Sequence, residues 1–249
     1  MSSGAERLAE LIRGAGSVVA LTGAGISVPS GIPDFRSPVT GIWADVDPME
    51  VAHITAFRRN PVRFWQFYGE RFSVLDGKQP NGAHRALAEL EARGLLEAVI
   101  TQNIDGLHRA AGTRDVIEVH GSVATASCSH CGAEVPLADV RRRAAEAQDG
   151  VPRCAADGTA LKPDVVLFGE LLDDRAMTRA STLATAADLL VCVGSSLEVF
   201  PVAGLPRLTL AAGGDVAIVT RSATHYDSRA AVRLDGDVEE ELEAVLAAL

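Results

Sequence analysis

Short apolar segments that alternate with helical periodicity are the feature that most constrains the fold of this chain. In residues 5–13, Leu8, Leu11 and Ile12 recur on one face of a predicted helix, which Gly14 and Gly16 end. Further helices are predicted at residues 61–75, 82–93 and from 237 onwards, and strands at 17–21, 97–101, 115–120, 188–196 and 215–220. Short apolar strands separated by helices are typical of a parallel sheet with helices on both faces. The sequence therefore predicts an α/β fold.

Two stretches interrupt this alternation. Residues 122–163 contain cysteines, prolines and glycines in place of the regular pattern, and residues 37–80 form a second excursion. A chain of 249 residues is long enough for one α/β domain or for a large domain with a small satellite. We expect the two stretches to be inserted modules.

A glycine loop follows the first predicted strand. Gly23 and Gly25 come directly after the apolar run at 17–21. A strand, a glycine turn and a helix form the dinucleotide-binding arrangement, in which backbone N–H groups hold a pyrophosphate. The third glycine of the usual G-x-G-x-x-G pattern is absent, and a glycine turn also occurs for purely steric reasons. The loop alone leaves both interpretations open.

Polar side chains follow three of the predicted strands. Gln102, Asn103 and Asp105 come after one strand, and His120 after the next. Gly194, Ser195 and Ser196 come after a third. Ligands of α/β folds bind at the carboxyl ends of strands, so the three groups predict one shared crevice. The alternative is that each is structural, with the Asn, Asp and Ser residues capping helices and His120 satisfied by a neighbour.

Charge and hydropathy exclude several classes of protein. The net charge of -10 is unlike the basic footprint of nucleic-acid binding. The first residues, MSSGAERLAELI, carry charges where a signal peptide needs an apolar core. No stretch approaches the roughly 18 apolar residues of a membrane helix. We therefore expect a cytoplasmic protein that binds neither nucleic acid nor membrane.

Seven segments occur together in the order found in sirtuins. They are GAGIS, SGIPDFR, TQNIDGLH, HGS, the Cys128-x-x-Cys131 pair, LKPDVVLFGE and GSSLEVFP. The chain closely resembles this family of NAD-dependent protein-lysine deacylases over almost its whole length. The resemblance implies a Rossmann-like domain of residues 1–36, 81–121 and 164–249. It implies a smaller domain made of a helical module, residues 37–80, and a zinc-ribbon-like module, residues 122–163.

The resemblance also implies which residues bind NAD. The glycine loop would approach the pyrophosphate, the PDFR segment would form a cofactor loop, and the strand ends at 102–105 and 194–196 would hold the nicotinamide and adenosine sides. These residues are Gly23, Ala24, Gly25, Ile32, Asp34, Phe35, Arg36, Gln102, Asn103, Ile104, Asp105, Gly194, Ser195, Ser196 and Thr220.

Catalytic and substrate roles follow from the same resemblance. His120 and Asn103 would be catalytic, with His120 as the base that takes a proton from a ribose hydroxyl. The acyl group would move from lysine to ADP-ribose, and nicotinamide would be released. An acyl-lysine peptide would pair with a strand edge and contact one further residue, which gives Val166, Phe168, Gly169, Glu170 and Val199. The expected partners are acyl-lysine segments of proteins, bound by a monomer or a weak oligomer.

Four residues form the expected metal site, and one of them departs from the family pattern. Three of the four cysteines lie between positions 128 and 154, which favours a metal or structural thiols over disulfides in a cytosolic chain. The family usually has a second C-x-x-C pair, but here Cys154 is followed by Asp157. Zinc accepts carboxylate oxygen, so Cys128, Cys131, Cys154 and Asp157 predict a zinc site. Three thiols without metal are the alternative.

A second departure lies at the expected adenosine side. Sirtuins usually have Asn and Glu where this chain has Thr220 and Ser222. Thr220 has a hydroxyl but not the side-chain amide of the usual Asn, so we expect weaker or different adenosine contacts.

The sequence does not decide which acyl group the protein prefers, because a motif of only two residues bears on it. Tyr68 and Arg71 are three apart on a predicted helix and therefore share a face. Sirtuins that prefer succinyl, malonyl or glutaryl groups carry Tyr-x-x-Arg here, so Arg71 would pair with the acyl carboxylate. An exposed arginine beside a core tyrosine explains the motif equally well. Ala52 leaves room for a larger acyl group if it reaches the pocket.

Three other functions remain compatible with parts of the sequence. A protein ADP-ribosyltransferase of the same fold would share the first step. A module that binds NAD and peptide without turnover would keep the grooves, although the intact His120, Asn103 and Asp105 speak against it. A nicotinamide dehydrogenase is suggested by the glycine loop alone.

Overall fold

A six-stranded parallel sheet forms the larger part of the molecule. The computed structural model describes residues 3–34, 48–75 and 77–249. The strand order is β3-β2-β1-β7-β8-β9, and every neighbouring pair is parallel. The strands are β1 (Val18–Thr22), β2 (Ala98–Thr101), β3 (Val116–Glu118), β7 (Leu189–Val193), β8 (Asp215–Val219) and β9 (Val232–Leu234). The chain leaves β1 toward β2 and β3 on one side and reaches β7, β8 and β9 on the other, so a topological switch point lies between β1 and β7.

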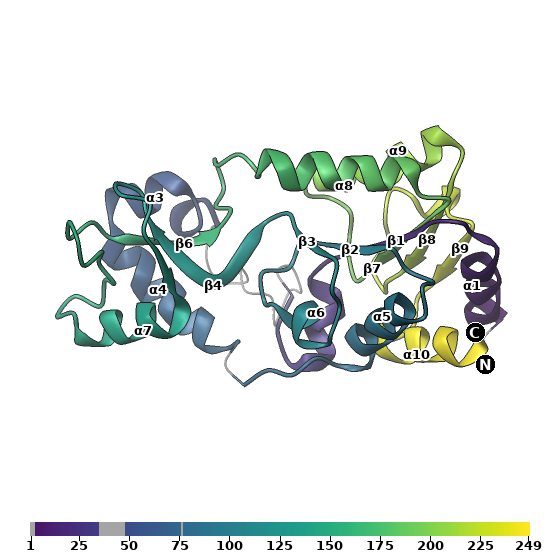
Figure 1. Cartoon of the computed structure of the whole chain (residues 1–249), viewed down its shortest axis with the longest axis horizontal. Coiled ribbons are helices and arrows are strands. Elements are labelled where there is room, and N and C mark those ends of the chain that lie inside the picture. Colours follow the sequence, from purple (N-terminus) through teal and green to yellow (C-terminus); the bar gives the residue numbers. More distant parts are fainter. Residues whose placement is uncertain (1–2, 35–47, 76) are drawn as a thin grey trace.

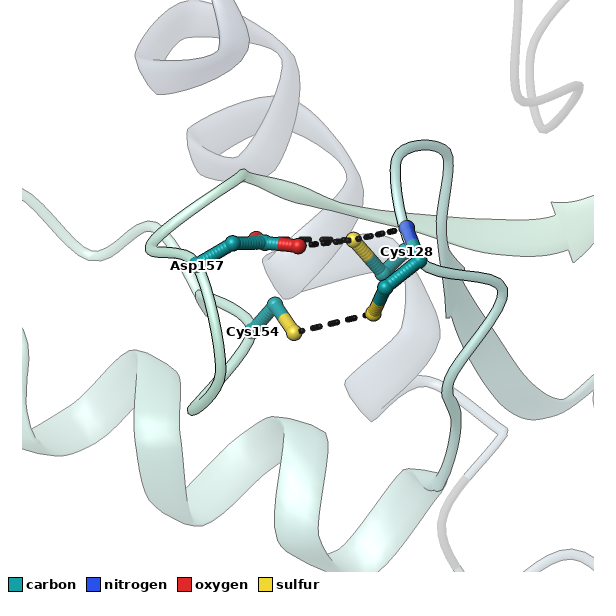
Figure 2. Close-up of side chains that lie close together, drawn as sticks. Cys128, Cys154 and Asp157 are labelled. Atoms are coloured by element: carbon teal, nitrogen blue, oxygen red, sulfur yellow. Dashed lines mark hydrogen bonds between the residues drawn. The ribbon is translucent and has the colours of Figure 1, made fainter.

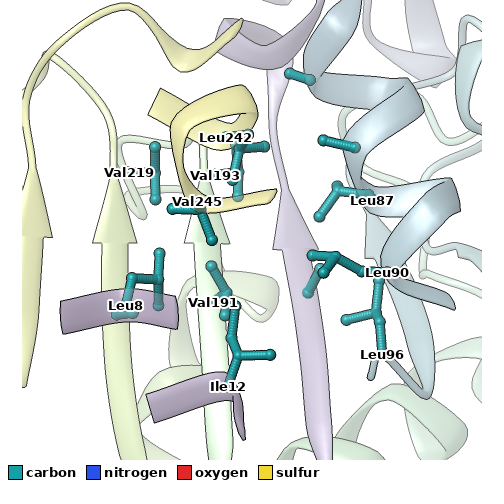
Figure 3. Close-up of a cluster of buried hydrophobic side chains, with 14 of the residues drawn as sticks. Leu8, Ile12, Leu87, Leu90, Leu96, Val191, Val193, Val219, Leu242 and Val245 are labelled. Atoms are coloured by element: carbon teal, nitrogen blue, oxygen red, sulfur yellow. The ribbon is translucent and has the colours of Figure 1, made fainter. Parts of the chain in front are cut away.

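Helices cover both faces of this sheet. One face packs against α1 (Ser3–Gly14), α5 (Gly82–Ala92) and α10 (Val238–Ala248), and Figure 3 shows Leu8, Leu87 and Leu242 meeting the strand residues there. The other face packs against α8 (Asp174–Ala186) and α9 (Leu205–Ala212). The predicted Rossmann-like sheet with helices on both faces is confirmed (Figure 1).

A smaller, antiparallel sheet lies at the other end of the molecule (Figure 1). Its order is β5-β4-β6, with β4 (Gly121–Cys128), β5 (Glu134–Pro136) and β6 (Leu161–Val165). The helices around it are α2 (Pro48–Val51), α3 (Ile54–Arg59), α4 (Pro61–Ser73) and α7 (Leu137–Glu146). Phe64, Trp65 and Phe72 of α4 share one buried cluster with Leu161 of β6, and the Trp65 Nε1–H donates to the Leu161 carbonyl at 3.0 Å.

The two interruptions of the alternating pattern therefore pack on one another, although they are far apart in sequence. Together they form the smaller part of the molecule that the sequence predicts beside the parallel sheet. The boundaries assigned to the two modules, 37–80 and 122–163, stay a prediction.

Several elements differ from the sequence expectation. After the glycine turn the chain forms a 3₁₀ helix, η1 (Ala24–Ser30), which contains Pro29. The strand predicted at 188–196 ends at Val193, because Gly194 turns the chain with φ +61°. Elements outside the predicted ranges include α8, α9 and β9, together with the short α6 (Leu107–Ala110), η2 (Val202–Gly204) and η3 (Asp227–Arg229). In the part of the chain that the structure describes, no helix is long and apolar enough to cross a membrane.

A buried polar layer lies beneath the carboxyl ends of β1 and β2. His108 of α6 donates its Nε2–H to Thr22 Oγ1 at 2.9 Å, and Thr22 donates in turn to Thr101 Oγ1 at 2.8 Å. His84 of α5 donates its Nδ1–H to Asn81 Oδ1 at 3.0 Å. The two imidazole rings are in contact, with centroids 4.9 Å apart. Burial lowers the pKa of His108 to about 3 and that of His84 to about 4.

These pKa shifts predict that the protein loses stability in mildly acidic solution. A histidine with an unfolded pKa near 6.5 takes up a proton in the unfolded chain but not in the folded one, so stability is present above that pH and falls below it. Each such histidine contributes a slope of up to roughly 1.4 kcal/mol per pH unit. The slope is obtained from the free energy of unfolding in urea between about pH 6.5 and 5, above the range where most carboxylates titrate.

The variants His84→Gln and His108→Gln should each reduce this slope, whatever their effect on absolute stability. His225→Gln is the matched control, because His225 is exposed. A slope that is the same in the wild type and in both buried variants would show that these histidines do not control the acid response.

Candidate functional site

The loops after β1 and β7 approach each other so closely that only glycine fits. The Gly25 N–H donates to the Gly194 carbonyl at 2.8 Å, and the Gly23 N–H donates to the Val193 carbonyl at 3.0 Å. A Cβ on Gly25 would lie 2.7 Å from the Gly194 oxygen, and one on Gly194 would lie 2.2 Å from the Ile26 nitrogen. The glycines predicted to approach a pyrophosphate therefore also meet a steric demand at the switch point of the sheet.

Residues from β1, β2 and β7 converge on this point. Gln102 donates its Nε2–H to Ser195 Oγ at 2.9 Å. Asn103 donates its Nδ2–H to the Gly23 carbonyl and to Ser27 Oγ, each at 3.1 Å. Of the three strand ends from which a crevice is predicted, those after β2 and β7 are joined by a direct side-chain contact.

Ser27 connects the residues of this crevice, and the sequence reasoning missed its role. Its hydroxyl donates to Asp105 Oδ2 at 2.7 Å and accepts from Asn103. Asp105 also accepts the Leu107 N–H through Oδ1 at 2.9 Å, so both of its oxygens are engaged. The only available signal was a serine two residues after Gly25 in the GAGIS segment.

One buried acceptor in the crevice is left over. Asn103 Oδ1 is buried and has no hydrogen-bond partner among the residues that the structure describes. The orientation of the amide is fixed by its two donated hydrogen bonds, so the oxygen cannot turn away. Buried polar atoms are nearly always satisfied, so this oxygen is suited to accept a hydrogen bond from a ligand.

His120 follows β3 at the same edge of the sheet. Its Nδ1–H donates to the Gln102 carbonyl at 3.0 Å, which leaves Nε2 without a proton. Burial lowers the pKa of His120, while the hydrogen bond to Gln102 raises it by less. The imidazole is therefore neutral at pH 7, with Nε2 able to accept a proton.

The segment Val166–Glu170 runs from β6 past His120. The Val166 N–H donates to the His120 carbonyl at 2.8 Å. The Phe168 N–H donates to the Ala52 carbonyl, and the Phe168 carbonyl accepts the Ile54 N–H, both at 2.9 Å. The Glu170 carboxylate accepts from the Leu167 N–H at 2.9 Å and pairs with Lys162 at 3.0 Å. Glu170, expected to bind substrate, thus directs its side chain to its own segment.

The remaining predicted residues differ in burial, and some of them are not described by the structure. Val199 is exposed beside Phe200 in the loop after β7, while Thr220 is buried at the end of β8, where its N–H donates to the Leu234 carbonyl. Ile32 is buried, Ala24, Asp34, Ile104 and Ser196 are half-buried, and Ile104 packs against the aromatic cluster of α4. Phe35, Arg36 and the side chain of Arg71 lie outside the described residues.

Tyr68 and Ala52 belong to one buried cluster. The Tyr68 ring stacks on Phe64 with centroids 4.5 Å apart, and both residues share the cluster with Ala52 and Leu167. Ala52 thus lies next to the Val166–Glu170 segment, which the sequence alone could not establish.

The three clustered cysteines and Asp157 come together at the far end of the smaller sheet (Figure 2). Their ligand atoms all lie within 4.8 Å of one another. The Sγ atoms of Cys131 and Cys154 are 3.6 Å apart, and Cys128 Sγ lies 3.4 Å from Asp157 Oδ2. Ligands of a tetrahedral zinc ion are separated by roughly 3.3–3.8 Å, so the group could hold this metal. Cys192 is buried in β7, as expected for a core residue.

Comparison with known proteins identifies a family whose members are similar in sequence to this chain. The model of the Sir2 family matches residues 23–201. An NAD-dependent protein deacetylase of Caldivirga maquilingensis is 43% identical over 243 residues, which is 98% of this chain and 93% of that protein. An NAD-dependent protein deacylase of Pyrococcus abyssi is 42% identical over 209 residues, 84% of this chain and 83% of that protein.

Solved structures of relatives superpose over nearly the whole chain. A structure described as Sir2 with a p53 peptide and NAD+ has a TM-score of 0.89 at 40% identity and covers 96% of both chains. A structure of Sir2 bound to acetylated peptide has a TM-score of 0.89 at 38% identity and covers 97% of both chains. With the family model covering most of the sequence and relatives above 40% identity along nearly all of it, the chain belongs to the Sir2 family.

Proposed function

We propose that this chain is an NAD-dependent protein-lysine deacylase that transfers the acyl group to ADP-ribose and releases nicotinamide. The observation that carries the proposal is His120, a neutral imidazole with Nδ1 bound to a carbonyl, between the glycine crevice and the Val166–Glu170 segment. The names of the relatives support it, as do the NAD+ and acetylated peptide described in their solved structures.

The crevice fits a dinucleotide by its own chemistry. Gly23 and Gly25 allow the backbone to come close to a pyrophosphate. The leftover Asn103 Oδ1 is matched to a carboxamide N–H or a hydroxyl, both of which NAD carries. When bound, NAD supplies a ribose carbon from which nicotinamide can leave. Ser27 and Asp105 keep Asn103 in place, which restricts the position of the ligand beside it.

His120 then acts as the general base. Its Nδ1–H remains on the Gln102 carbonyl, and Nε2 takes the proton of a ribose hydroxyl. Because burial favours the neutral ring, the base is available at neutral pH without prior deprotonation. The acyl-lysine is positioned by pairing of its backbone with the Val166–Glu170 segment, in the manner of an added strand.

The general-base role predicts the behaviour of His120→Ala. Turnover of an acetyl-lysine peptide should fall by a factor on the order of 10²–10⁴, because proton transfer is lost. NAD affinity should stay within a few fold. Mass spectrometry of peptide and acyl-ADP-ribose, with and without NAD, measures turnover, and calorimetry measures NAD binding.

His225→Ala is the matched control, since that histidine is exposed. Near-normal turnover by His120→Ala would remove this residue from the base role. ADP-ribosylated protein in place of acyl-ADP-ribose would favour the transferase alternative, and a wild type without any turnover would favour a binding module.

We propose further that the acyl pocket accepts acidic acyl groups. Ala52 and Tyr68 belong to one buried cluster with Leu167, and this shared cluster supports a role for Tyr68 beside the acyl chain. Arg71 is three residues further along the same helix. A guanidinium group pairs with a carboxylate in a bidentate manner, which supports Arg71 as the partner of an acidic acyl group.

A comparison of two acyl groups tests this pocket. Arg71→Met should lower kcat/KM for a succinyl-lysine peptide by roughly ten- to a hundredfold, because a charged hydrogen bond contributes about 1.5–3 kcal/mol. Activity on the acetyl-lysine form of the same peptide should change little. Tyr68→Phe should cause a smaller loss of the same kind. Equal losses on both peptides would mean that Arg71 supports the fold and that the enzyme is a plain deacetylase.

We propose that Cys128, Cys131, Cys154 and Asp157 hold one structural zinc ion. The Thr159 N–H donates to Asp157 Oδ1 at 2.9 Å and holds the pKa of this carboxyl well below its usual range. Asp157 is therefore ionised and suited to a cation. Cys128 and Leu161 are paired across β4 and β6, so the metal would fix the end of the smaller sheet.

Metal analysis of the purified protein should give about one zinc per chain. Cys131→Ser should lose the metal and lower the thermal unfolding temperature, because the smaller sheet loses a crosslink. Asp157→Cys should retain it, since a fourth thiolate is also a zinc ligand. A stable, metal-free wild type would leave the three cysteines as structural thiols.

A further inference from the structure

His53 lies against the segment that the proposed function assigns to substrate. It is the N-cap residue of α3 and forms an isolated parallel bridge with Phe168. The backbone hydrogen bonds of Ala52 and Ile54 to Phe168 hold this position firmly. The His53 ring covers Gly169, because a Cβ on Gly169 would lie 2.4 Å from His53 Nε2. Gly169 also has φ +82°, so no other residue fits beneath this ring without strain.

The local hydrogen bonds fix the tautomer of this imidazole. Nδ1 accepts the Thr55 N–H at 3.1 Å and lies 2.8 Å from Thr55 Oγ1. The proton of the neutral ring is therefore on Nε2. Within the described residues, Nε2 has no hydrogen-bond partner, so one donor at the rim of the segment is left for another molecule.

Leu167–Glu170 form a turn, in which the Glu170 N–H donates to the Leu167 carbonyl at 3.0 Å, and two backbone groups beside it are left for a bound peptide. In residues 48–75 and 77–249, no backbone group donates to the Val166 carbonyl, and no acceptor meets the Gly169 N–H. An added strand would lie about 4.7–4.9 Å from this segment. A side chain of two or three carbons next to the acyl-lysine could then reach the donor over Gly169. Phe168 and Leu171, with 44% and 92% of their surfaces exposed, provide apolar contact on the same stretch.

We infer that His53 is a specificity-determining residue, whose Nε2–H donates to a side-chain oxygen of the residue next to the acyl-lysine. The inference rests on the proposed function, because it needs the peptide to pair with Val166–Glu170. The oxygen belongs to a carboxylate or a carboxamide, so Glu and Gln are preferred over Ala at that position of the peptide. A neutral donor serves both, and a carboxylate forms the stronger bond.

Peptide binding without NAD tests this recognition independently of turnover. Fluorescence anisotropy gives the Kd of acetyl-lysine peptides that carry Glu, Gln or Ala at either neighbouring position. The wild type should bind the best Glu or Gln peptide about three- to tenfold more tightly than its Ala counterpart. His53→Asn keeps an N-cap acceptor for α3 and removes Nε2–H. His53→Phe keeps a ring over Gly169 and has no donor.

Both variants should bind the three peptides with nearly equal Kd, and NAD binding should be unchanged as a check of folding. A wild type without preference, or a preference that survives in both variants, would overturn the inference. An equal weakening for all three peptides would also overturn it, because the ring would then only shape the segment. NAD-dependent turnover of the acetyl peptide by the wild type is measured separately, so failure of the proposed function is recognised on its own.

Discussion

The contact between Gly25 and Gly194 is the constraint on which the rest of the structure depends. It joins the loops after β1 and β7, the two central strands, where the order of the sheet reverses. Any side chain at either position would push these loops apart. With the loops in contact, Gln102 reaches Ser195 across the switch point, and Asn103 reaches the Gly23 carbonyl. The crevice is therefore a product of backbone packing, and its polar side chains are placed by that packing.

The smaller part of the molecule is connected to this crevice through a few backbone groups. Val166 bonds to His120, and Phe168 bonds to Ala52 and Ile54. The proposed base, the proposed peptide segment and the helical module are thus linked in one continuous hydrogen-bonded path. A shift of α3 or β6 would move the substrate segment relative to His120. This linkage explains how two modules distant in sequence can contribute to a single site.

Much of the fold could be predicted because its signals are local. Buried strands, glycine turns and polar residues at strand ends are visible in short stretches, and they gave the sheet and the crevice. The sequence could not predict that Ser27 connects Asn103 with Asp105, or that Ala52 lies beside Phe168, because each contact depends on a partner distant in sequence. The 3₁₀ helix Ala24–Ser30 was not among the predicted helices, because its seven residues are too few to show a helical period. The roles of Phe35, Arg36 and Arg71 stay predictions.

The pairing of β1 with β7 has a consequence for how the chain reaches its native state. Val18 is in register with Leu189, so the central pair of the sheet joins segments from opposite ends of the sequence. During synthesis, β1 must wait until most of the chain has left the ribosome before it can gain its second neighbour. Contacts of such long sequence separation slow folding and leave apolar strands exposed for longer. The apolar residues of β1 therefore stay without this neighbour until β7 has been made.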